Sequence, residues 1–171
     1  MNTAHLHLLL NHIPVLGAFF GTVLLSVGLV KKDNIILTVS LWTFLIVAVA
    51  SSGAFFTGEG AEEIVENTAG VNESMIEAHE EASAVAFYTM IVLGVLSALI
   101  LLINRKKDVI IKSSFGVLLV AVLVNGLMFR SGWLGGKIKH DEIRGTVASA
   151  PASENNTETG GAESEQEKDD D

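Results

Sequence analysis

Four long apolar segments alternate with short polar links along the first 130 residues of the chain. They run over Ile13–Val30, Ile35–Phe56, Ala82–Ile103 and Val109–Phe129, and Lys112 is the only charged residue inside any of them. An α-helix of about 20 apolar residues is long enough to cross the hydrocarbon core of a bilayer. We therefore expect an all-α fold, a four-transmembrane-helix up-down-up-down bundle.

Polar residues beside the apolar segments predict where the helices begin. Asn34 and Asp108 stand just before or at the start of the second and fourth segments, as N-cap residues do. Ser74–Glu77 has the sequence of a capping box, which predicts a third helix from about Met75 to Ile103 that starts well before the membrane.

The distribution of Lys and Arg predicts how the bundle is oriented. Six basic residues lie in or near the first and third links: Lys31, Lys32, Arg105, Lys106, Lys107 and Lys112. The second link, Thr57–Glu81, has none, and four follow the fourth segment: Arg130, Lys137, Lys139 and Arg144. Because short basic loops prefer the cytoplasm, we expect both termini and the second link to lie outside, on the periplasmic face of a bacterial cytoplasmic membrane.

The amino-acid composition indicates two regions in the chain and excludes some kinds of site. We expect a four-helix transmembrane domain over residues 1–144 and a disordered acidic tail over 145–171, since the tail cannot bury an apolar core. The absence of cysteine excludes disulfides, thiolate–metal sites and covalent thioether attachment of haem. The 11 basic residues are divided between two membrane faces, so nucleic acid is not an expected partner.

The histidines are the main candidates for function, because all five fall at the expected outer face: His5, His7, His12, His79 and His140. Pro14 either starts the first membrane helix or kinks a longer helix that begins near Thr3. The first and third membrane helices of an up-down bundle are diagonal neighbours, so we expect His12 and His79 to face each other at similar depth. Two such imidazoles are the axial ligands of a b-type haem. Arg130, on the same side, is expected near a haem propionate.

A transition metal ion is the alternative cofactor. Imidazole and carboxylate together suit zinc, iron or manganese, and a mixed site would draw on His5, His12, His79, Glu59, Glu62 and His140. Glycines beside Glu59 and Glu62 permit unusual backbone there. The competing interpretation of this acidic link is a solvated loop, and His140 is either a third ligand, a lid residue or an exposed side chain.

The arrangement of His12-Ile-Pro14, His79 and His140 resembles uncharacterised small four-helix bacterial membrane proteins with a histidine-rich first helix followed by proline. It is more distantly similar to the b-type cytochrome bundles, and the resemblance covers residues 5–144 at the level of topology. Those bundles often hold paired histidines within the membrane and toward both faces. Here every histidine is expected at one face, which leaves room for one outer haem.

Two functions from different classes follow. The first is a small membrane protein that binds b-type haem or a transition metal and transfers electrons to a redox or respiratory membrane partner. The second is a non-catalytic membrane subunit or assembly protein whose polar outer face binds a partner and whose histidines bind no cofactor. No nucleophile with a matched base is visible to indicate an enzyme.

Overall fold

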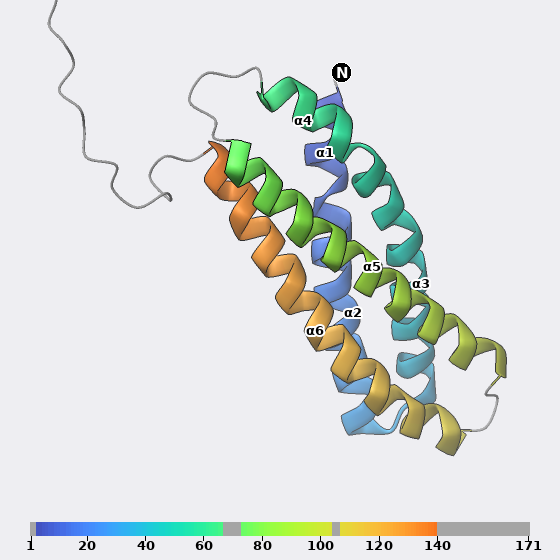
Figure 1. Ribbon diagram of the computed structural model, residues 1–171. Helices are drawn as coiled ribbons and strands as arrows, with labels where there is room; N and C mark the ends of the chain where they lie inside the picture. The colour runs from blue at the N-terminus through green and yellow to red at the C-terminus, as the bar shows by residue number, and fades with distance from the viewer. Residues whose placement is uncertain (1–2, 67–72, 104–106, 140–171) are drawn as a thin grey trace, which may run out of the picture.

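The computed structural model describes residues 3–66, 73–103 and 107–139, and these residues form α-helices joined by short links (Figure 1). The helices are α1 Thr3–Leu10, α2 His12–Lys31, α3 Asn34–Phe56, α4 Gly58–Glu66, α5 Glu73–Ile103 and α6 Lys107–Lys139. Four candidate membrane spans lie in them: His5–Lys31, Asn34–Glu63, Glu73–Leu102 and Val109–Ile138. Over these described residues, the expectation of an all-α fold with four such helices is confirmed. His140, Arg144 and the tail lie outside the described residues.

The outer surface of these helices is largely apolar. In each candidate span, only 28–39% of the most apolar 18-residue stretch is buried inside the protein. Many large apolar side chains point outward instead, among them Val30, Ile35, Leu102, Leu119 and Phe129. Such a continuous apolar exterior indicates a lipid bilayer as the surrounding medium, and the chain as a multi-pass membrane protein.

Two helix starts differ from the sequence prediction. Asp33, not Asn34, is the N-cap of α3, because its Oδ1 accepts hydrogen bonds from the backbone N–H groups of Ile35 at 2.8 Å and Ile36 at 3.2 Å. Likewise α6 already begins at Lys107, so Asp108 lies within its first turn. The third predicted helix is confirmed as α5, which starts two residues earlier than expected.

The N-terminal segment is helical from Thr3, with an interruption at Asn11 between α1 and α2. Pro14 has no N–H to donate to the carbonyl of Leu10, so the hydrogen-bond ladder is broken at this point. The structure therefore favours the longer, interrupted helix over one that starts at Pro14. A short helix that the sequence did not predict, α4, follows α3 in the acidic link.

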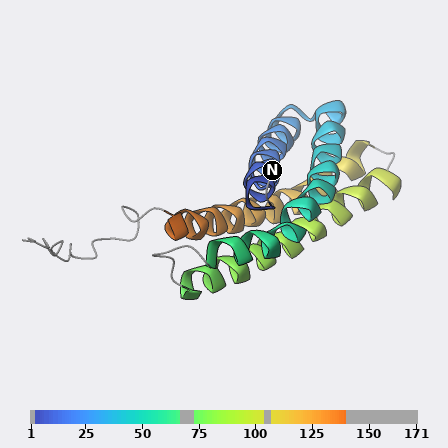
Figure 2. The ribbon, with the colours of Figure 1, turned by 90° about the horizontal axis from the view of Figure 1, so that it is seen from above.

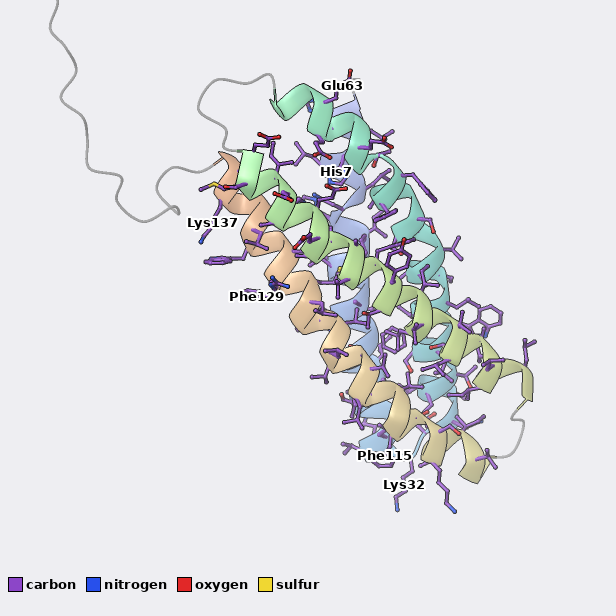
Figure 3. The ribbon with its side chains drawn as sticks, viewed as in Figure 1. His7, Lys32, Glu63, Phe115, Phe129 and Lys137 are labelled. Carbon is purple, nitrogen blue, oxygen red and sulfur yellow. The ribbon has the colours of Figure 1, made fainter. Side chains whose placement is uncertain are left out.

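The long helices pack as two pairs, α2 with α3 and α5 with α6, and α3 joins the pairs along α5 (Figure 2). At one end α1 packs against α4, beside the start of α5 and the end of α6 (Figure 1). We call this the histidine end. Lys32 lies at the opposite end, and His7 and Glu63 at the histidine end (Figure 3).

Small residues bring the helices together. An added Cβ at Gly21 would come within 2.6 Å of the Phe44 ring, and one at Gly94 within 2.4 Å of the Ala48 side chain. These glycines therefore serve helix packing, as small residues commonly do in membranes. A polar contact also joins α6 to α2, since the Asn125 side-chain amide donates to Thr22 Oγ1 at 2.8 Å.

Candidate functional site

His79 lies in the second turn of α5 and reaches across to α6. Its Nδ1 is 2.9 Å from the carbonyl oxygen of Ser131, and its Nε2 is 3.4 Å from the hydroxyl of Ser83. The hydroxyls of Ser83 and Ser131 are 2.7 Å apart. Gly135 lies against the ring one turn further along α6. The imidazole is thus half-buried between the two helices that form one half of the molecule.

His7 makes the equivalent contact in the other half. It projects from α1, and its Nδ1 is 2.9 Å from the carbonyl oxygen of Ala54 and 3.4 Å from Thr57 Oγ1, both in or beside the last turn of α3. Gly58, at the start of α4, is close to the ring. Figure 3 shows His7 at the histidine end, where α1 meets α3 and α4.

The backbone contacts define which nitrogen of each neutral ring carries the hydrogen. A carbonyl oxygen can only accept, so Nδ1 of His7 and Nδ1 of His79 must each donate to theirs. The lone pair of each neutral imidazole is then on Nε2. Histidine ligands of metals usually have this arrangement, with the second nitrogen held by a carbonyl or carboxylate.

Both rings lie at the histidine end, His7 on α1 and His79 in the second turn of α5. We call His7, His79, Ser83 and Ser131 the imidazole cluster. Its hydrogen bonds lie within each half of the molecule: those of His7 join α1 to α3, and those of His79 and Ser83 join α5 to α6.

His12, the expected partner of His79, makes a hydrogen bond within the N-terminal helices. Its ring is exposed, and its Nδ1 donates to the carbonyl oxygen of Leu8 in the preceding turn, 2.7 Å away. Successive helical residues are about 100° apart, so a residue five positions from an inward His7 points to a different side. His7, which was not among the expected site residues, contacts α3 through Ala54.

Of the residues expected to hold a metal ion, those that the structure describes do not gather into one group. His5 and His12 are exposed on α1 and α2, and Glu59 is exposed on α4, whereas Glu62 is half-buried. Among residues 3–66, 73–103 and 107–139, no group of three His, Cys, Asp or Glu side chains is arranged to hold a metal ion. His140, the remaining candidate, lies outside these ranges.

Arg130 is also separated from the imidazole cluster. It is exposed, whereas its neighbour Ser131 is buried and faces His79. The one-residue step turns the Arg130 side chain about 100° away around α6. The Arg130 side chain therefore lies on another side of α6 than Ser131, which contacts His79.

Comparison with known proteins adds no assignment to this geometry: no family model, no curated protein and no solved structure matches the chain.

Proposed function

We propose that this chain is a small integral membrane protein that binds b-type haem between His7 and His79 and takes part in electron transfer. The observation that carries the proposal is that both rings have the same hydrogen-bond arrangement. Each Nδ1 donates to a carbonyl of a neighbouring helix, which leaves Nε2 with a lone pair for a ligand.

Haem suits this pair better than a bare metal ion does. A structural zinc ion takes about four protein ligands and a catalytic one about three. The described residues offer no such group of three. Haem brings four equatorial nitrogens of its own and needs only axial ligands from the protein, so two imidazoles suffice.

The residues around the rings support a ligand at this place. Gly58 and Gly135 have no side chain beside the imidazoles, and Ser83 and Ser131 are small. The Ser83 hydroxyl can turn wholly to Ser131 when Nε2 of His79 binds a ligand, so no hydrogen-bonding group is stranded. Bound haem would supply one-electron redox chemistry, while these residues hold both rings in register.

The orientation in the membrane is part of the proposal. Lys31 and Lys32 at the α2–α3 link, and the basic residues of the third link, favour the cytoplasm. The four long helices would then form an up-down-up-down bundle in a bacterial cytoplasmic membrane. Both termini and the imidazole cluster would be periplasmic, where a redox or respiratory membrane partner can reach the cluster.

The test is to express the full chain with ample haem supply, purify it in mild detergent and record its absorbance and metal content. We expect a Soret band with bound haem near one per chain. His7→Ala and His79→Ala should each lose at least nine-tenths of it, because a single remaining axial ligand holds haem weakly. His12→Ala is the matched control, since it removes an exposed imidazole from the same segment, and it should retain the wild-type haem content.

Three results would overturn the proposal. A colourless protein with a stoichiometric transition metal would identify a metal site instead. A protein with neither would favour a subunit or assembly protein that binds a partner through its polar end. Loss of haem in His12→Ala but not in His7→Ala would mean that the His7–His79 pair is not the ligand set.

A further inference from the structure

Three side chains gather near the end of α6, on the side that faces away from the imidazole cluster. At about 100° per residue, Arg130, Trp133 and Lys137 lie within about 60° of each other around the helix. The Nζ of Lys137 is 3.5 Å from the centroid of the Trp133 ring. Arg130 is exposed, and Trp133 is 50% exposed. Figure 3 shows Lys137 beyond Phe129 on the outward side of this helix.

The depth of these residues indicates their surroundings. The candidate span of α6 runs from Val109 to Ile138, so Trp133 and Lys137 lie in its last two turns. Phe129, which is 75% exposed, precedes them on the apolar side. Tryptophan concentrates at the level of the lipid headgroups, and Lys and Arg near helix ends extend their charges to that level.

The two cations determine which headgroup fits. We propose that Arg130, Trp133 and Lys137 form a binding surface for an anionic phospholipid, with the phosphate held between the two cations. Arg130 offers a planar, multiply donating guanidinium to phosphate oxygens, and Lys137 adds a second positive charge over the indole ring. These cations stand on the expected outer face, against the usual charge bias, and the phosphate of a lipid headgroup at that level is negatively charged.

The apolar part of the surface has a place for the lipid chain. Gly126 lies one turn before Arg130 on the same side of α6, and an added Cβ there would have nothing within 4 Å. An acyl chain can lie against the bare backbone at this position, beside Phe129. The proposal is independent of haem, because the surface and the imidazole cluster lie on different sides of α6.

The chain contains two tryptophans, Trp42 and Trp133, which allows a local readout. Trp42→Phe leaves Trp133 as the sole tryptophan, which can be excited selectively. This protein is placed in bilayers of phosphatidylglycerol and phosphatidylcholine, with bromine on the chains of one lipid at a time. We expect Trp133 to be quenched preferentially by brominated phosphatidylglycerol, with an exchange constant of about five in its favour. Arg130→Gln with Lys137→Gln should bring this constant to about one.

Controls distinguish this surface from a general preference for anionic lipid. Arg130→Lys with Lys137→Arg keeps the charges and should keep most of the preference. Lys31→Gln with Lys32→Gln removes charges from the opposite end and should leave quenching of Trp133 unchanged. Equal quenching of Trp133 by the two lipids in the Trp42→Phe protein, or an unchanged preference after both outer cations are neutralised, would overturn the proposal.

Discussion

Gly135 sets how closely α6 approaches the imidazole of His79. A Cβ at this position would come within 3.0 Å of the ring Cε1 atom and 3.2 Å of Nδ1, closer than such atoms normally pack. Because Nδ1 of the same ring donates to Ser131, any displacement of the ring also strains that hydrogen bond. The absence of a side chain at Gly135 is therefore part of how His79 is positioned.

Gly135→Ala should reduce haem content and broaden the Soret band, because the ring of His79 must tilt away from Ser131. Gly132→Ala is the matched control one turn earlier, where an added Cβ meets nothing within 4 Å. It should keep the haem content and gain up to about 1 kcal/mol of helix stability. Absorbance spectra of both variants, recorded at equal protein concentration, provide the measurement. Identical spectra for Gly135→Ala and the wild type would show that the ring tolerates the methyl group.

Some residues of the imidazole cluster could be predicted from the sequence. His79 follows a capping box on a long amphipathic-to-apolar helix, so its place on a rigid element near the membrane was predictable. The choice of His7 over His12 was not, because both lie on one short segment and the selection depends on which carbonyl α1 meets. Ala54 and Ser131 act through backbone oxygens, which every residue has, so their side chains carry no signal.

Among the elements, α2 and α3 show how glycine determines the packing of a helix pair. Phe44 is fully buried, and its ring lies over Gly21 of α2. Gly17 and Gly28 similarly face Val47 and Leu37 of α3. Small residues suit both a cofactor slot and close helix packing, and these three glycines lie where α2 packs against α3.

Gly21→Ala should destabilise the α2–α3 pair by about 1–3 kcal/mol, because the new methyl group overlaps a buried ring. The apparent Tm in detergent, followed by circular dichroism, should fall. Gly116→Ala adds the same methyl group to α6 where no atom lies within 4 Å, and its Tm should stay level or rise. A Gly21→Ala protein as stable as the wild type would indicate that α2 and α3 do not pack this closely in the membrane.

Element boundaries were predictable to within one or two residues where a polar residue caps the helix, as at Asp33 and the start of α5. The break at Asn11 was left open, since Pro14 is compatible with a helix start and with a kink. Helix α4 was missed because its nine residues include two glycines and four glutamates, a composition typical of a loop. Its packing against α1 stabilises it instead, and that contact is not visible from local sequence.

For the whole molecule, orientation is the property that decides which side of the membrane the imidazole cluster faces. The chain has no cysteine, so a single introduced cysteine reports its own side. Lys31→Cys should resist an impermeant thiol reagent in intact cells and react after permeabilisation. Glu59→Cys should react in intact cells, and both positions are exposed in the structure. The reverse labelling would place the cluster in the cytoplasm.

The composition of the tail, residues 145–171, leads to a prediction about stability. Deleting residues 145–171 should leave the Tm in detergent and the haem content within error of the full chain, because no apolar contact is expected from it. The comparison of full and truncated chains under one purification scheme is the measurement. A fall of several degrees in Tm would show that the tail packs on the bundle.

The imidazole cluster also has a consequence for assembly. His7 is held by α3 and His79 by α6, so each half of the molecule positions one ring on its own backbone. A ligand that binds both rings would link residues 3–66 to residues 73–139. By thermodynamic linkage, each tenfold rise in ligand concentration above its Kd would make the association of the two halves more favourable by about 1.4 kcal/mol. Co-expressed as two separate chains, the halves would then join more tightly when loaded than when empty.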